Sequence, residues 1–345
     1  MQVTEVVEEG SVRVDLVGGT LDLYPINLIL PGVVTCNVAT SLKAKVSIRS
    51  HEGQLMLKSM DYETSQSIDS EQFQGKSDEI NWDEFGALGF LAILCHQFGL
   101  RDNAIVETLS GSPPGAGLGG SSALGITVGK AINRFLNLGL STDQIFKKVK
   151  DIEAQILGQG VPGYQDYLPA IHGGVLAIHA QPGENKVEQL YSPELAKVLE
   201  SHALLVYSGK TRKSGINNWE VYKGFFDGEK AVQEGLSQLN SVAKDFYRWL
   251  KEGSWDRLPH AMAREGEVRG SLFEGIETQE VRKLKGELKT LSGFIGIKIC
   301  GAGGGGCFLV LHDGHCADQI EKVVQKNNMR VLPFQIETPV LGESA

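Results

Sequence analysis

The sequence is short of the features that mark nucleic-acid-binding or membrane proteins. Its 33 Lys and Arg residues are outnumbered by 42 Asp and Glu residues, which gives a net charge of −9. Nucleic acids and anionic membranes attract an excess of basic residues, so the composition argues against both as partners. The most apolar run, FGALGFLAILC, is far shorter than the roughly 20 residues needed to cross a bilayer.

Cysteines are also few, and their spacing is irregular. The five form no CxxC pair and no zinc-type pattern, and an odd number suits a reducing compartment. The N-terminus, MQVTEVVEEG, is acidic and lacks the apolar run of a secretory signal. We therefore predict a cytoplasmic protein that has neither a membrane nor a nucleic acid as a partner.

Glycine is in excess, with 42 of 345 residues, whereas an average protein has about 7%. Five glycines stand in the uncharged stretch SPPGAGLGGSSALG (residues 112–125). A glycine-dense turn lets backbone N–H groups converge on a ligand, and a helix that starts directly after it adds its dipole. The stretch therefore predicts an anion site, most often one for phosphate.

Two other nucleotide-binding patterns fit the sequence less well. Residues 115–120 contain a GxGxxG, but two prolines precede it and its helix leads to another helix, not to the second strand of a dinucleotide site. The GKT at 209–211 resembles a Walker A loop, but Leu204 stands where that loop needs its first glycine. A phosphate loop of another kind remains.

The order of predicted elements indicates an α+β protein. Alternating segments on either side of HEGQ predict a β-hairpin over residues 42–62. Further strands are predicted at 12–17, 104–109, 174–179, 203–207, 296–300 and 306–311. Helical periodicity is clearest at 84–98, 122–137, 141–157, 228–251, 277–291 and 315–327. The C-terminal half predicts a small sheet with helices packed on one face, and the polar stretch HAQPGENKVEQ predicts a domain boundary near residue 184.

Three segments resemble the motifs of the GHMP kinases, the superfamily of galactokinase, homoserine kinase, mevalonate kinase and phosphomevalonate kinase. They are RVDLVGGTLDL (13–23), PPGAGLGGSSA (113–123) and KICGAGGGGC (298–307), in the family's order. The resemblance implies a two-domain α+β architecture, with a ribosomal protein S5 domain 2-like N-terminal domain (1–184) that carries the phosphate loop and a ferredoxin-like C-terminal domain (185–345). It also implies ATP and Mg²⁺ as cofactors, a small-molecule alcohol as substrate and a homodimer as a possible assembly.

The same resemblance implies roles for single residues. The nucleotide would be bound by Pro114, Gly115, Ala116, Gly117, Leu118, Gly119, Gly120, Ser121 and Ser122. The magnesium ligands would be Ser121 and Glu153, and Ser122 could exchange roles with Ser121. Asp166, in GYQDY, would accept the proton of the substrate hydroxyl or orient that hydroxyl. Arg13 would lie close to the transferring phosphate.

On the substrate side, the resemblance implies contacts from Gly19, Thr20, Asp22, Gly303, Gly304 and Arg212. Carboxylates suit hydroxyl groups, since each can accept two hydrogen bonds from them. Lys298 and the glycines of 301–306 would close the site from the C-terminal domain.

The first motif favours a sugar substrate. It lacks the Glu-His that galactokinases show at Gly19 and Thr20 and the Gly-Glu-His of mevalonate kinases, and it most resembles the branch of heptose 7-phosphate kinase and fucokinase-type enzymes. That branch reads Gly-Thr-Asp, whereas Leu21 separates Thr20 from Asp22 here. We expect phosphorylation of a sugar or sugar phosphate, whose anionic group the basic loop 210–213 could bind. A kinase of another alcohol, such as a mevalonate-type one, and a catalytically silent nucleotide-binding regulator remain as alternatives.

Overall fold

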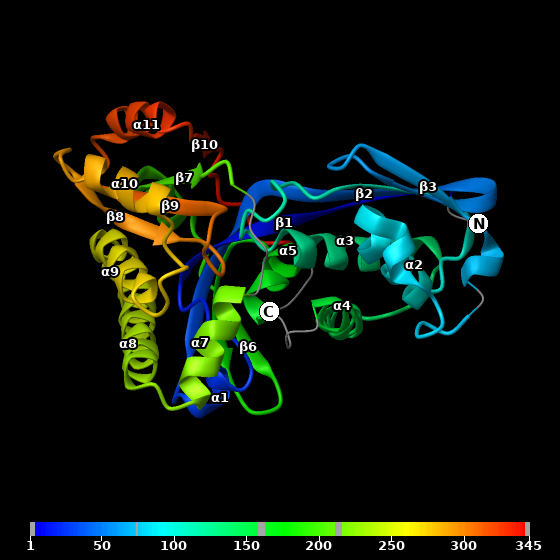
Figure 1. Cartoon of the computed structure of the whole chain (residues 1–345), viewed down its shortest axis with the longest axis horizontal. Helices are drawn as coiled ribbons and strands as arrows, with labels where there is room; N and C mark the ends of the chain where they lie inside the picture. Colours follow the sequence, from blue (N-terminus) through cyan, green and yellow to red (C-terminus); the bar gives the residue numbers. More distant parts are fainter. Residues whose placement is uncertain (1–3, 74, 158–162, 211–215, 342–345) are drawn as a thin grey trace. The chain divides into compact units, whose positions relative to one another are not determined.

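The structure is a computed structural model that describes residues 4–73, 75–157, 163–210 and 216–341 (Figure 1). The chain forms two compact units, and each is discontinuous in sequence. Unit 1 is drawn from residues 1–12, 43–114 and 120–162, and unit 2 from residues 13–42, 115–119 and 163–345. The strands β1 (Glu5–Val17) and β2 (Val34–Ser59) contribute residues to both units.

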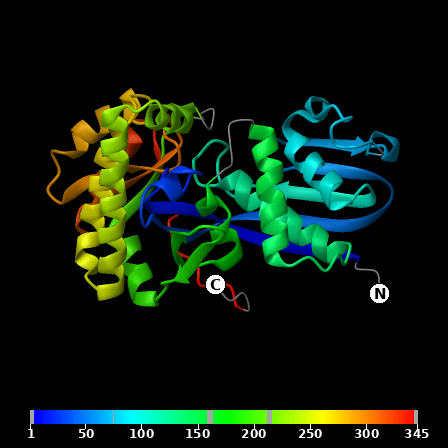
Figure 2. The same ribbon diagram turned by 90° about the horizontal axis from the view of Figure 1, so that it is seen from below.

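Unit 1 packs helices on one face of a sheet. Its remaining elements are β3 (Thr64–Ile68), the 3₁₀ helices η1 (Ser70–Phe73) and η2 (Trp82–Leu88), α2 (Gly89–Phe98), β4 (Asp102–Leu109), α3 (Gly120–Phe135) and α4 (Thr142–Leu157). The helices α2, α3 and α4 lie below the strands β2 and β3 in Figure 1 and in front of those strands in Figure 2. The predicted helices at 122–137 and 141–157 are thus confirmed within a few residues, whereas only residues 89–98 of the helix predicted at 84–98 are α-helical.

The predicted hairpin over 42–62 is wrong, because β4 lies between its two arms. Residues of β4 pair with both arms of β2: Val106, for example, is opposite Ile48 in the first arm and opposite Leu57 in the second. Alternate side chains of β4, from Ala104 to Thr108, are buried. A third strand therefore takes the backbone hydrogen bonds that a hairpin would have formed within itself.

In unit 2, residues 34–38 of β2 pair with β5 (Val175–Ala180), and β5 in turn pairs with β6 (Asn185–Gln189). Three short helices belong to the same unit: α1 (Ile26–Ile29), η3 (Tyr164–Asp166) and α5 (Leu168–His172). The domain boundary near residue 184 falls in the turn between β5 and β6, and it stays a prediction.

The second sheet of unit 2 has the strand order β10-β7-β9-β8. Its strands are β7 (Ala203–Tyr207), β8 (Phe294–Ile299), β9 (Cys307–His312) and β10 (Arg330–Leu332). The helices of this part are α6 (Pro193–Ser201), α7 (Ile216–Phe226), α8 (Lys230–Glu252), η4 (Trp255–Arg257), α9 (Leu258–Gly270), α10 (Gln279–Leu288) and α11 (Ala317–Lys326). Strand–helix–strand–strand–helix–strand connectivity is that of the ferredoxin-like motif. Every residue of the central strand β9 is buried, so the sheet is covered on both faces at this strand.

Helix α9 lies unusually close to β8 because small residues separate them. A Cβ at Gly266 would be 2.2 Å from the carbonyl oxygen of Ile297, and one at Gly296 would be 2.5 Å from the Cβ of Ala263. The long helix α8 runs beside α9 in both views (Figures 1 and 2). This close packing brings the polar side chains of α9 against β8.

All five cysteines are buried as free thiols. Burial raises the pKa of Cys300 to about 12, and it also raises the pKa values of Cys36, Cys95 and Cys316. None of the helices that the structure describes is long and apolar enough to span a membrane.

Candidate functional site

In unit 1, the first turn of α3 places two serine hydroxyls against one carboxylate of α4. Ser121 Oγ donates to Glu153 Oε1 at 2.5 Å, and Ser122 Oγ donates to Glu153 Oε2 at 2.7 Å. The two helices approach this closely because a Cβ at Gly125 would be only 2.6 Å from Val149 Cγ1, so nothing larger than glycine fits there.

These three side chains differ in their access to solvent. Ser122 and Glu153 are buried, at 2% and 5% exposure, whereas Ser121 is exposed. Hydroxyl and carboxylate oxygens are the hard ligands that Mg²⁺ prefers. The donor set fits a magnesium ion, and an ion arriving from solvent would meet Ser121 before Ser122.

In unit 2, Arg13 of β1 joins Asp166 to the glycine loop. Its Nε and Nη2 donate to Asp166 Oδ1 at 2.8 and 2.6 Å, and its Nη1 donates to the carbonyl oxygen of Gly117 at 2.5 Å. Burial alone would lower the pKa of Arg13, but the charges of Asp166 and Asp15 outweigh burial and raise it above its ordinary value. Arg13 is therefore a permanent cation that fixes the carboxylate of Asp166, whose side chain is 26% exposed.

The loop 115–119 adopts a conformation that requires its glycines. Gly115, Gly117 and Gly119 have φ values of +68°, +75° and +67°, in the left-handed region that other residues avoid. A Cβ at Gly119 would lie 3.1 Å from the carbonyl oxygen of Asp166 and 3.2 Å from Arg13 Cγ. The backbone itself therefore packs against the arginine and the aspartate.

The C-terminal glycine motif contacts the same loop within unit 2. Cys307 N donates to the carbonyl oxygen of Ala116 at 2.7 Å, and a Cβ at Gly306 would be 2.6 Å from that oxygen. Gly304 N donates to the carbonyl oxygen of Ile276 at 2.9 Å, and Gly303 also packs on Ile276. Unit 2 thus brings together Arg13 of the first motif, the loop 115–119 of the second and Cys307 of the third.

Asp22 lies in a buried, weakly paired position. It is 5% exposed, and the backbone N and the Nε2 of Gln165 are both 3.4 Å from its carboxylate oxygens. Burial and the charge of Asp166 together raise the pKa of Asp22 to about 7, against the opposing effect of Arg13. The neighbouring turn includes Gly19 and Thr20, which has φ +76°.

A buried charge network beside this turn was not predicted from the sequence. Asp15 Oδ2 accepts from Lys298 Nζ at 2.7 Å and from Arg269 Nη1 at 3.4 Å, and its Oδ1 accepts from Gly301 N at 3.3 Å. Glu265 Oε2 lies 3.4 Å from Lys298 Nζ. Lys298 is fully buried among these groups, so it supports the glycine motif from beneath and does not close the site.

The pattern of β1 held a signal for this network. Arg13 and Asp15 are charged residues two positions apart in the stretch 12–17 of β1, whose other residues are all apolar. Residues two apart in a strand point to the same face. Charged groups are almost never fully buried unless they are paired, so this alternation indicates a charge-binding face.

Of the basic loop 210–213, the structure describes only Lys210. Arg212 and Lys213 lie outside the described residues. Lys210 forms an ion pair with Glu280 of α10, so its charge is already compensated.

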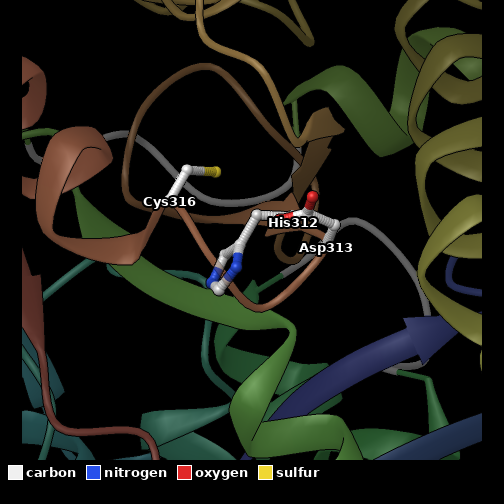
Figure 3. Close-up of side chains that lie close together, drawn as sticks. All are labelled: His312, Asp313 and Cys316. Atoms are coloured by element: carbon white, nitrogen blue, oxygen red, sulfur yellow. The ribbon is translucent and has the colours of Figure 1, made fainter.

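A second group of potential metal ligands does not have the chemistry of a metal site. Ligand atoms of His312, Asp313 and Cys316 lie within 4.8 Å of one another (Figure 3). Gly314 N donates to His312 Nδ1 at 3.0 Å, and burial lowers the pKa of this histidine, so the proton of the neutral ring stays on Nε2. Asp313 Oδ1 accepts from His315 N at 3.0 Å. These bonds shape the turn between β9 and α11.

Comparisons with known proteins agree on one family. Residues 87–174 match the GHMP kinases N terminal domain, and residues 244–330 match the GHMP kinases C terminal domain. The bifunctional fucokinase/GDP-fucose pyrophosphorylase of Arabidopsis thaliana is 27% identical over 88% of this chain, which spans only 29% of that protein. The D-glycero-alpha-D-manno-heptose 7-phosphate kinase of Campylobacter jejuni is 27% identical over 66% of this chain and 67% of its own length. The crystal structure of the Methanococcus jannaschii mevalonate kinase has a TM-score of 0.76 at 20% identity and covers 98% of this chain and all of its own.

Proposed function

Because the chain belongs to the GHMP kinases, a family of small-molecule kinases, we propose that it transfers a phosphoryl group from ATP to a hydroxyl of a sugar or sugar phosphate. The observation that carries this proposal is the set of bonds from Arg13 to Asp166 and to Gly117. These bonds fix Asp166, which must hold a hydroxyl, relative to the loop 115–119, which binds the phosphates. Phosphoryl transfer depends mostly on such positioning and on electrostatic stabilisation.

Each group has a task in this reaction. The backbone N–H groups of the loop 115–119 and the start of α3 bind the phosphates of the nucleotide. Ser121 and Glu153 hold Mg²⁺, which when bound neutralises charge on the phosphates. Asp166 orients the acceptor hydroxyl and takes its proton, and Arg13 keeps that carboxylate aligned.

The relatives leave a choice between sugar and mevalonate acceptors, since both kinds of kinase match the chain. Two features favour a sugar. The first motif has Gly-Thr at positions 19 and 20, without the Glu-His of galactokinases and mevalonate kinases. Asp22 then supplies a buried carboxylate, which suits hydroxyl groups.

A phosphorylation screen tests the proposal. Purified protein is incubated with ATP, Mg²⁺ and a panel of sugars, sugar phosphates and mevalonate, and products are read by phosphorus NMR. We expect a sugar or sugar phosphate to be phosphorylated, and the Asp166→Asn variant to lose that turnover. Asp256→Asn, the same change at an exposed position of η4, is the matched control. Nucleotide binding without any phosphorylated product across the panel would instead favour the regulator alternative.

A further inference from the structure

The residue before Asp166 forms a pair with Asp22. Gln165 is 5% exposed, and its Nε2 points at Asp22 Oδ1, 3.4 Å away. This neighbour fixes the orientation of the amide, because the opposite orientation would set the amide oxygen against a carboxylate oxygen. Asn37 Nδ2 donates to the backbone carbonyl of Gln165 at 3.1 Å, which holds the residue in place.

The amide oxygen of Gln165 is left without a protein partner. Oε1 is buried and has no hydrogen-bond partner among the residues that the structure describes. A buried polar atom that is left unpaired has lost its hydrogen bonds to water without replacing them, which is unfavourable. The neighbouring carboxylate of Asp22 is also poorly paired, with two long contacts of 3.4 Å. Gln165 therefore offers an acceptor that the described residues leave unpaired, and the adjacent Asp22 offers carboxylate oxygens that can accept further hydrogen bonds.

Ligand groups that donate hydrogen bonds suit both acceptors. A carboxylate or phosphate would be repelled by Asp22 and by the nearby charge of Asp166, and it could not donate to an amide oxygen. Hydroxyl groups donate to both. Because the two side chains contact each other, the hydroxyls that reach them must be neighbours on the ligand.

We propose that Gln165 and Asp22 together bind a vicinal diol of the acceptor, with one hydroxyl donating to Gln165 Oε1 and the next to the Asp22 carboxylate. This inference rests on the proposed function for the identity of the site and narrows its substrate class to polyhydroxylated molecules such as sugars. Mevalonate lacks a vicinal diol and carries a carboxylate. Gln165 is thus a specificity-determining residue.

Direct binding, measured without phosphoryl transfer, tests the diol pair. The probes for calorimetry are D-mannose, L-fucose, D-glycero-D-manno-heptose 7-phosphate and mevalonate, and the best-bound sugar is then compared with its monodeoxy forms. We expect a sugar to bind more tightly than mevalonate, and two deoxy forms at adjacent carbons to bind about 10- to 100-fold more weakly. Gln165→Met removes the amide at nearly constant size, and the exposed Gln325→Met of α11 is its matched control.

The decisive result is a coupling between protein and ligand. The Gln165→Met variant should bind one of the two deoxy forms as tightly as it binds the parent sugar. The hydroxyl that this form lacks is the one that would donate to Gln165 Oε1, and the variant has no such acceptor. Equal losses for every sugar in this variant would show a merely structural residue and overturn the proposal, as would tighter binding of mevalonate or no sugar binding at all. The proposed function is judged separately, by product formation: a coupled diol site in a protein that transfers no phosphoryl group would refute the kinase activity alone.

Discussion

The buried pair of Asp15 and Lys298 allows a quantitative test of what holds the glycine motif in place. Both side chains are fully buried, and 2.7 Å separates Oδ2 from Nζ. Burial by itself would raise the pKa of Asp15, but Lys298, Arg13 and Arg269 overcome it and lower that pKa below its ordinary value. The aspartate is therefore ionised and depends on its cations.

Removing one member of such a pair leaves an uncompensated charge, at a cost of about 3–5 kcal/mol. For Asp15→Asn we expect the lower end, about 3 kcal/mol, because Glu265 lies 3.4 Å from the same ammonium and can ionise to compensate it. Burial raises the pKa of Glu265, so this group is readily available to change its charge. Lys298→Met should cost a similar amount. The double variant should cost far less than the sum, since it removes both charges together.

Urea unfolding followed by tryptophan fluorescence measures these costs. Trp82 lies in unit 1, so a Trp82→Phe background restricts the signal to the tryptophans of unit 2, which are Trp219, Trp249 and Trp255. With a slope of about 3 kcal/mol per molar urea, each single variant should lower the midpoint by about 1 M. Additive costs in the double variant would refute the pairing, and so would single variants that unfold at the midpoint of the background.

Four further changes test the site. Asp166→Asn should lower kcat by about 100- to 10,000-fold and leave the nucleotide Kd from calorimetry unchanged; loss of folded protein to the same degree would mark a structural residue instead. Acceptor hydroxyls donate to the ionised form of Asp22, whose pKa is about 7, so acceptor affinity is present above that pH and lost as the pH falls through it. The acceptor Kd should fall about tenfold between about pH 6 and pH 8, and a slope that persists in Asp22→Asn would contradict this assignment. Ser121→Ala should raise the Mg²⁺ concentration needed for half-maximal activity, and an unaltered metal titration would move the ligand role to Ser122. Gly306→Ala should lower both Tm and nucleotide affinity, because φ is +76° and the new Cβ would lie 2.6 Å from a carbonyl oxygen of the loop; wild-type values of both would show that the loop tolerates a side chain there.

Local patterns in the sequence predicted the parts of the site that local chemistry determines. Glycines and the absence of charge indicated the loop 115–119, and its three positive φ values agree with that reason. The roles of its residues remain predictions. Asp22 and Asp166 were singled out by resemblance, but no pattern in the sequence indicated that Gln165, between the glycine turn and Asp166, would contact Asp22. That contact joins residues far apart in the chain and depends on tertiary packing.

The missed elements also have physical reasons. Helix α9 was not predicted, because its buried face includes Glu265 and Arg269 as well as apolar residues, and the apolar periodicity is broken. Its polar positions become understandable only once Lys298 and Asp15 are placed beside them. The hairpin prediction failed for a related reason: alternation shows that a segment is a strand and not which strand it pairs with.

The burial of every cysteine makes the thiols reporters of how each unit opens. Cys95 belongs to unit 1, whereas Cys36, Cys300, Cys307 and Cys316 belong to unit 2. A thiol reagent reacts with the exposed thiolate, so each sulfur must wait until its surroundings open. Mass spectrometry that counts modified sulfurs over time would therefore measure the opening rate of each unit separately. Unit 1 would be followed through one cysteine and unit 2 through four, without any engineered label.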